Sequence, residues 1–258
     1  MRDIVPDADG TEICHARGRG SRVTICIVQI IEVSVTGVRS AVLHVRRRGT
    51  PLRFTFFPMV HVGLPTFYED VAARLRSVDL IVAEGIQGDS ESTAAIMKAF
   101  EQATKGRGAA LVVQHIDYDT LGPEVLCPDM TGADLERALR QEVPLLDRLL
   151  LRASPIAALA IRFLGPEVVM NSYLTVDDLP TAQQELFDEP AAIDKVIVHD
   201  RDALVTKALA EIYEQHQSED MHVAVVYGAE HVPGIFGYLH AAFGYRVVSA
   251  EWLNVYNF

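Results

Sequence analysis

Two histidines and one glutamate, each capable of acid–base chemistry or metal binding, stand just after apolar runs of the sequence. Imidazole nitrogen and carboxylate oxygen suit Zn, Mn, Fe or Co and leave coordination positions for water. A metal bound there would lower the pKa of a bound water and polarise a carbonyl. Without a metal, the same side chains suit proton transfer from an attacking water. These residues are His61, Glu84 and His231.

Glycine lies close to each of these residues, in the segments His61-Val62-Gly63, Glu84-Gly85 and Gly228-Ala229-Glu230-His231. Glycine lets backbone or ligand approach closely. Pro233 suits the first turn of a helix, so His231 is expected just before a helix N-terminus, where free N–H groups favour developing oxyanions. Glu230 is a second candidate, besides Glu84, for taking a proton from the attacking water.

A mixed α/β fold is expected to position these groups. The runs 23–35, 38–45 and 52–57 are rich in Val, Ile, Phe and Thr and predict an antiparallel β-meander. Beyond it, short apolar strands alternate with helices, which favours parallel pairing with crossovers and a mixed sheet. Polar residues at the carboxyl ends of such strands converge on one rim, where ligands bind. The expected strands are 78–83, 109–113, 222–227 and 245–252, and the expected helices are 66–76, 92–104, 203–216 and 234–243.

Three details of this organisation can be tested in the structure. Thr66 and Glu69 have the spacing of a capping box at the start of a helix. Residues 131–188 are expected to be a helical insertion, with a kink at Pro144 and a further helix from Ala153 to Leu164. Residues 1–20 are a candidate for a disordered segment, which leaves 21–258 as a single domain.

The composition excludes several classes of protein. The chain has 258 residues, 49% hydrophobic and 22% charged, which is an ordinary globular balance. Its net charge of −12 makes nucleic acid a poor partner. Three cysteines form no CxxC pair, no signal peptide is visible, and no apolar run reaches the roughly 18 residues of a membrane span. We therefore expect a cytoplasmic protein with no nucleic-acid or membrane partner, and leave a homo-oligomer open.

The segments around the three candidates resemble the TraB/PrgY/GumN family of the wider Tiki and erythromycin-esterase-like superfamily. The resemblance rests on Phe57 to Gly63, Asp79 to Gly85 and Val225 to Ile235, in that order, and covers about residues 50–252. Gln114 to Tyr118, Asp129-Met130 and Asp200-Arg201-Asp202 resemble further segments of the family. Pro58 departs from it, because the first G-x-x-H motif has a glycine there.

The resemblance implies a mixed α/β core built from two related halves. Tiki members are metal-dependent proteases with two histidines and a glutamate at the site, and erythromycin-esterase-like members use equivalent groups for metal-free hydrolysis. By position, the resemblance makes His61, Glu84 and His231 the metal ligands and Arg201 an electrostatic partner. It also makes Gln114 a pocket-lining residue.

The roles of three of these residues remain open from the sequence. Asp117 offers a metal ligand and Tyr118 a phenol for substrate binding, but a loop aspartate that accepts backbone N–H bonds is equally common. Arg201 is expected to hold a substrate carboxylate, to orient Glu84, or to be a salt-bridge partner only.

The leading hypothesis is a metal-dependent, peptidase-like hydrolase that cleaves a peptide or amide bond with a metal-activated water. Its substrate would be a peptide or a small molecule. One alternative is a metal-free, esterase-like hydrolase that uses histidine and glutamate. The other is a module that binds a peptide, haem or another small ligand without catalysis.

Overall fold

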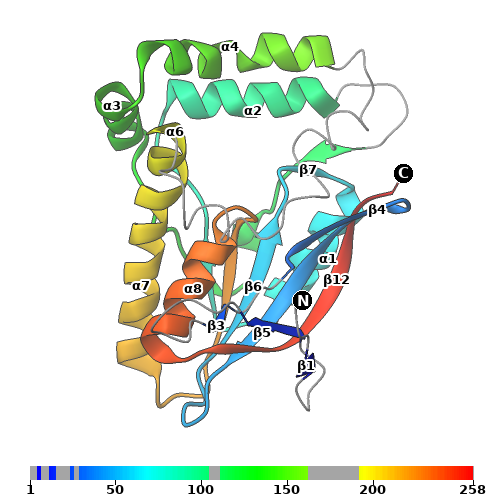
Figure 1. Cartoon of the computed structure of the whole chain (residues 1–258), viewed down its shortest axis with the longest axis vertical. Helices are drawn as coiled ribbons and strands as arrows, with labels where there is room; N and C mark the ends of the chain where they lie inside the picture. Colours follow the sequence, from blue (N-terminus) through cyan, green and yellow to red (C-terminus); the bar gives the residue numbers. More distant parts are fainter. Residues whose placement is uncertain are drawn as a thin grey trace.

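The computed structural model describes residues 5–6, 12–15, 24–25, 29–104, 111–161 and 192–257. These residues form a mixed α/β fold around a seven-stranded sheet, as predicted (Figure 1). Its strand order is β10-β8-β11-β6-β5-β12, and β4 also pairs with β5. A separate small sheet contains β1 (Val5–Pro6), β2 (Glu12–His15) and β3 (Thr24–Ile25). The rest of the segment 1–20 lies outside the described residues.

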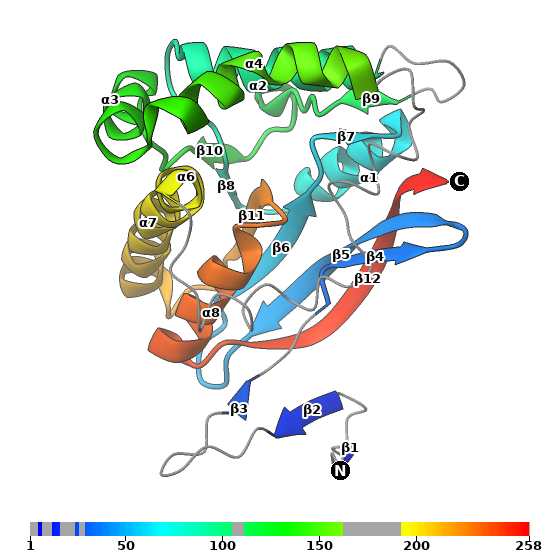
Figure 2. The ribbon, with the colours of Figure 1, turned by 45° about the horizontal axis from the view of Figure 1, so that its top comes forward.

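The predicted meander forms the antiparallel side of the sheet, but its first strand is shorter than predicted: of the described residues in the run 23–35, 31–34 belong to this sheet, whereas Thr24–Ile25 belongs to the small separate sheet. The strand β5 (Gly37–Arg46) pairs with β4 (Ile31–Ser34) along its first residues and with β6 (Arg53–Met59) along its last ones. The last strand, β12 (Arg246–Asn257), lies antiparallel along the other edge of β5. Figure 2 shows this side of the sheet as a twisted layer that ends at β12.

The other side of the sheet is parallel. The strand β11 (His222–Gly228) lies between β6 and β8 (Leu80–Ala83), and β10 (Glu124–Leu126) pairs with β8. All these pairs are parallel, so the carboxyl ends of β6, β8 and β11 lie at one rim. This parallel register brings residues that are distant in the sequence to the same edge.

Helices cover both faces of the sheet, because alternate side chains of each strand are apolar on both sides. On one face, α7 (Asp200–His216) and α8 (Val232–Phe243) pack on a core that includes Phe54, Phe56 and Val225. On the other face, α1 (Pro65–Leu75) packs on Phe57, Ile81 and neighbouring residues.

A helical layer lies beyond the carboxyl ends of the parallel strands (Figures 1 and 2). It contains the neighbouring helices α2 (Glu91–Thr104) and α4 (Leu145–Ile161), with α3 (Gly132–Glu142) at one end. The short α6 (Ala192–Asp194) and a π-helical turn, η4 (Lys195–His199), lead into α7. No helix in the described ranges combines the length and apolar character needed to cross a bilayer.

The structure corrects the predicted helix boundaries. The predicted capping box is absent, because Leu64 is the N-cap of α1, without a side-chain cap, and Pro65 occupies the first turn. Pro144 separates two helices, since the residue before a proline is driven out of the helical region and Val143 has φ −96° and ψ 130°. A single helix, α4, then continues through position 153, where a second one was predicted. Residues 162–188 of the predicted insertion lie outside the described residues.

The predicted strand 109–113 is also corrected. Only β9 (Val112–Val113) is present in its described part, and it pairs antiparallel with β7 (Val62–Gly63), outside the central sheet. The place beside β8 is taken by β10, which the sequence analysis did not predict. Val112 is 38% exposed, so this short segment does not have the two buried faces of a central strand.

Candidate functional site

The three residues predicted to form the site converge on the backbone of Gly228. A β-carbon built on this residue would lie 3.2 Å from Glu84 Oε2, 3.5 Å from His231 Cδ2 and 3.9 Å from His61 Nε2. The absence of a side chain at this position therefore leaves room for the three groups to share one space. His61 and Glu84 follow β6 and β8, and His231 is the N-cap of α8, as predicted.

The guanidinium of Arg201, in the first turn of α7, holds Glu84 in place. Its Nη2 donates to Glu84 Oε1 at 2.6 Å and to Asp129 Oδ2 at 2.7 Å, and its Nε donates to Asp129 Oδ1 at 2.9 Å. Its Nη1 donates to the Ile197 carbonyl and lies 3.4 Å from His231 Nε2. All three nitrogens therefore face protein groups, so Arg201 orients Glu84 and has little capacity left for a substrate carboxylate.

Asp129 fixes the guanidinium from the other side. Besides the two bonds from Arg201, its carboxylate accepts the backbone N–H groups of Gly85 at 3.1 Å and Met130 at 2.7 Å. Its side chain is fully buried. A buried carboxylate needs such compensation, and this one has four donors. The loop after β10 is thereby tied to the carboxyl end of β8.

A second carboxylate orients His231. Its Nδ1 lies 2.7 Å from Asp202 Oδ1, so Nδ1 carries the proton of this hydrogen bond and Nε2 points toward Glu84. A β-carbon on Gly234 would lie 2.4 Å from Asp202 Oδ2. The glycine in the first turn of α8 therefore allows Asp202, from α7, to approach the imidazole.

The electrostatics of Glu84 and His231 are coupled. Burial by itself would raise the pKa of Glu84, but the hydrogen bond with His231 and the charge of Arg201 outweigh it and hold this pKa well below its ordinary value. Burial would lower the pKa of His231, but the bonds with Asp202 and Glu84 raise it to about 9. A protonated His231 cannot accept from Arg201 at 3.4 Å, so its Nε2–H faces Glu84 Oε1 at 3.5 Å. His231 is therefore cationic and Glu84 anionic at neutral pH.

His61 differs from the other two candidates because no described residue forms a hydrogen bond with its ring. Its ring lies beside that of Phe100 from α2, with 5.0 Å between centroids. Protonation of His61 would lower the pKa of Glu84 further, because the two groups lie close together. The backbone carbonyl of His61 accepts from the Gln114 N–H at 2.7 Å.

Gln114 lies next to His61 because β9 pairs with β7 in a small separate sheet, and not because of the central sheet. Its side-chain Oε1 is buried and has no hydrogen-bond partner among the described residues. An unpaired buried acceptor is costly and is expected to meet a ligand or water. The backbone of Gln114 thus lies next to that of His61, and a role for its side chain in lining the site stays a prediction.

The remaining predicted residues are placed differently. Glu230 and Asp117 are exposed, and neither side chain has a hydrogen bond or ion pair within the described ranges. Tyr118 is half-buried, and burial, together with the charges of Cys127 and Glu84, raises its pKa. Tyr118 therefore lies near the cluster, whereas nothing brings the carboxylates of Glu230 and Asp117 into it.

Pro58, the departure from the family motif, lies inside β6 and pairs with Tyr227 of β11. The β5–β6 pairing ends at Phe56, and the Pro58 carbonyl accepts from Ser40 Oγ at 2.6 Å. The ladder to β11 continues, since the Ala229 N–H donates to the Met59 carbonyl at 2.9 Å. The proline is therefore accommodated without moving the strand end that precedes His61.

The sequence analysis did not choose three residues that complete the cluster. Asp129 and Asp202 appeared only as parts of the family-like segments. The position of Asp202 next to Arg201 in the sequence was a signal that could have identified it. The third is Tyr227, whose hydroxyl is buried without a partner in the described residues and whose ring packs on His231 at 5.8 Å. It lies within an apolar strand, where a tyrosine is typically a core residue.

The residues were tested for fit to the predicted divalent metal. The bond between His231 and Asp202 resembles the outer-shell support of a metal-bound imidazole. However, the cationic Arg201 lies against both His231 Nε2 and Glu84 Oε1, and Glu84 Oε2 accepts the Gly228 N–H at 2.7 Å. No group of three metal-type side chains in the described residues is arranged as a ligand set. As arranged here, these side chains do not form a ligand set for a metal. The divalent ion expected from the sequence stays a prediction.

In comparisons with protein-family models, curated proteins and solved structures, none matches the chain.

Proposed function

We propose that the protein is a hydrolase that cleaves an ester, or a similarly activated acyl bond, without a metal, using His61 as general base. The observation that carries the proposal is the contrast between the two imidazoles. His231 is engaged by Asp202 and Glu84, whereas the ring of His61 has no hydrogen bond to any described residue and faces the same space beside Gly228. Imidazole is the side chain that most often transfers protons in enzymes.

In the proposed reaction, His61 Nε2 takes a proton from a water whose oxygen attacks the carbonyl carbon. The bond to the alcohol oxygen then breaks, and the leaving alcohol takes the proton back from His61. Glu84 is a weak base because its pKa is lowered, so its role is to position the water and to stabilise the imidazolium that forms on His61. Arg201, Asp129, Asp202 and His231 are positioning residues, because they hold Glu84 in place.

The sequence resemblance supports the same residues, since erythromycin-esterase-like members use equivalent groups without a metal. The metal-dependent peptidase and the non-catalytic binding module remain alternatives. The cytoplasmic location also stays a prediction, based on the cysteine content.

The test is hydrolysis of a panel of aryl and alkyl esters by the full chain, before and after exhaustive chelation. His61→Ala should lower kcat/KM by about 100-fold or more, because a general base contributes 10² to 10⁴. His216→Ala is the matched control, since this histidine lies at the opposite end of α7 from Arg201 and pairs with Glu219, so the variant should retain wild-type turnover.

Three outcomes would contradict the proposal. Turnover that is unchanged in His61→Ala excludes this residue as the base. Activity that disappears on chelation and returns with Mn, Co or Zn favours the metal-dependent alternative. A folded protein that binds esters without releasing product favours the binding module.

A further inference from the structure

A pocket of about 150 Å³ lies at the opposite end of the central strands. It is lined by the first residues of β6 and β11, by the last residues of β5 and by the neighbouring part of β12. Since β6 and β11 rise about 3.3 Å per residue, their two ends lie about 20 Å apart. The pocket is therefore distinct from the candidate site, and the inference below does not depend on the proposed function.

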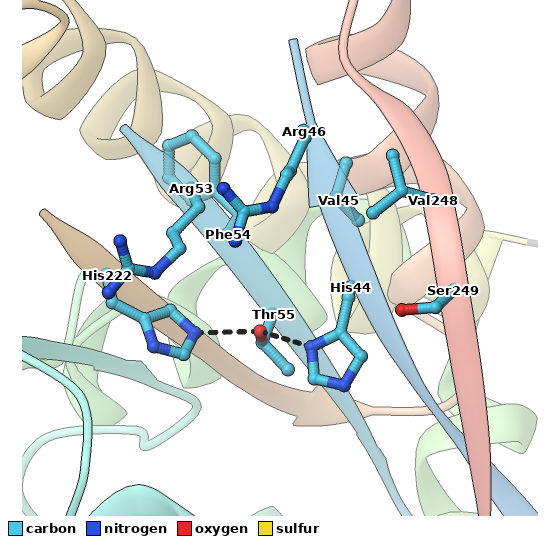
Figure 3. A pocket seen from close by; sticks show the side chains of 9 residues that line it. All are labelled: His44, Val45, Arg46, Arg53, Phe54, Thr55, His222, Val248 and Ser249. Atoms are coloured by element: carbon cyan, nitrogen blue, oxygen red, sulfur yellow. Dashed lines mark hydrogen bonds between the residues drawn. The ribbon is translucent and has the colours of Figure 1, made fainter. Parts of the chain in front are cut away.

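A row of polar side chains crosses four strands at this pocket, as Figure 3 shows in part. Thr55 Oγ1 lies 3.1 Å from His44 Nδ1 and 2.8 Å from His222 Nε2, and His44 Nε2 lies 3.3 Å from Glu251 Oε1. Glu251 only accepts, so neutral His44 carries its proton on Nε2 and accepts from the Thr55 hydroxyl. Thr55 in turn accepts from the Nε2–H of His222. Every hydrogen bond in the row thus has one donor and one acceptor.

Two guanidinium groups face this row from the same side (Figure 3). Arg53 forms an ion pair with Asp220, which is largely exposed. Arg46 has no ion pair with any described residue, and it lies at the end of β5, just beyond the last pair with β6. The pocket thus contains a cation whose charge the described protein does not neutralise.

The carboxylates around the pocket are already engaged. Glu251 accepts from Arg74 at 2.7 Å, and Asp79 accepts the backbone N–H of His222 at 2.7 Å. The positive surroundings also affect His222, whose pKa is lowered by burial and by the charges of Arg53 and Arg46, against the opposing charge of Asp79. The positive charge of the pocket is therefore not compensated by these carboxylates.

The strand β12 is irregular at this point. Its register against β5 shifts between Val247 and Ser249, so Val248 forms a bulge. Bulges re-aim side chains and are frequent next to binding sites. Ser249 here lines the pocket and offers a hydroxyl opposite His44.

We propose that this pocket binds a small oxyanion of the phosphate class, held by Arg46 and Arg53 and by the hydroxyl of Ser249. Guanidinium groups suit phosphate because their N–H groups match its oxygens in pairs. A cavity of about 150 Å³ accepts a molecule the size of benzene, which leaves room for inorganic phosphate or a small phosphate ester. The exposed apolar side chain of Val248 would flank the ester group.

The test is calorimetric titration of the full chain with inorganic phosphate at low ionic strength. Saturable 1:1 binding is expected, and Arg46→Gln should weaken it by about tenfold or more, as expected for a charge-assisted contact. The matched control is Arg39→Gln on the same strand, because Arg39 pairs with Glu32 and stacks on Trp252. His61→Ala should bind phosphate as the wild type does, which places the anion outside the candidate site.

Absence of saturable binding would overturn the proposal, as would equal affinities for the wild type and Arg46→Gln. A second titration with acetate tests the class of anion, because acetate has two oxygens and phosphate has four. Acetate that binds as tightly as phosphate would make the pocket a carboxylate site and contradict the phosphate class.

Discussion

The two ends of β6 and β11 carry opposite kinds of polar cluster. At the carboxyl ends, Arg201 is 5% exposed and its guanidinium is enclosed by acceptors. At the amino ends, Arg46 is exposed and Arg53 pairs only with an exposed carboxylate. The first arrangement is preorganised, because its charges are compensated within the fold. The second leaves positive charge available, which is what an anion from solution requires.

This difference has a cause in the topology. In parallel strands, the segments that follow the carboxyl ends cross over to helices, so the loops after β8 and β10 bring the carboxylates of Glu84 and Asp129 to the guanidinium of Arg201 at the start of α7. At the amino ends, the neighbours are the β5–β6 hairpin and the turn before β11, which are short and open to solvent. Three experiments test whether the two clusters differ in this way.

The largest effect is expected for Arg201→Ala. Its loss leaves Asp129 buried without its cation and Glu84 with His231 alone, and breaking a buried pair costs about 3–5 kcal/mol in the free energy of unfolding. Arg53→Gln is the matched change at the other end and should cost at most about 1 kcal/mol, because the pair with Asp220 is exposed. Urea unfolding monitored by circular dichroism measures both values. Equal losses would show that the two clusters do not differ in the way described.

A somewhat smaller effect is expected in the pH dependence of stability. The folded pKa of His231 is about 9, above its ordinary value of 6.5, so its contribution is complete below pH 6.5 and is lost as pH rises through 9. This contribution is about 3 kcal/mol. The folded pKa of His222 is lowered, so its contribution has the opposite sign and stability increases as pH rises toward 6.5.

Titration of the imidazole C–H resonances by NMR measures the two histidines separately. Asp202→Asn should lower the pKa of His231, because it removes the carboxylate that bonds Nδ1, and should leave His222 unchanged. A His231 that titrates below pH 7 in the wild type would contradict the assigned charge state.

The smallest of the three effects is expected for Thr55→Val. This change keeps the shape of the side chain but removes the hydroxyl between His44 and His222, and unpaired buried groups cost about 1–3 kcal/mol. Thr55→Ser keeps the hydroxyl and should recover most of this loss. Since Thr55 belongs to the anion pocket, ester turnover at the other end should not change. A Thr55→Val protein as stable as the wild type would show that Thr55 does not form the hydrogen bonds with His44 and His222.

Local residue patterns were sufficient to predict most of the helices and strands. The β-meander, the strands before Glu84 and Gly228, and the helices α2, α7 and α8 were all predicted, because alternation and helical periodicity report burial directly. The start of α1 was predicted wrongly, since Pro65 competes with the capping box at Thr66. The short β9 and β10 segments carry too few residues for a periodic signal, and their places in the sheets were missed.

Which chemical groups follow the strands could be predicted from the order of residues alone: His61 after β6, Glu84 after β8 and His231 before α8. Only the tertiary structure decided that Asp129 and Asp202 complete the cluster and that Arg201 orients Glu84. Only the structure also distinguished the imidazole of His61, which has no hydrogen bond to a described residue, from the engaged imidazole of His231. The reason is physical. The residue type at each position is given by the sequence, whereas the hydrogen bonds and charge state of Glu84 depend on burial and on partners distant in the sequence, such as Gly228, which lies 144 residues away.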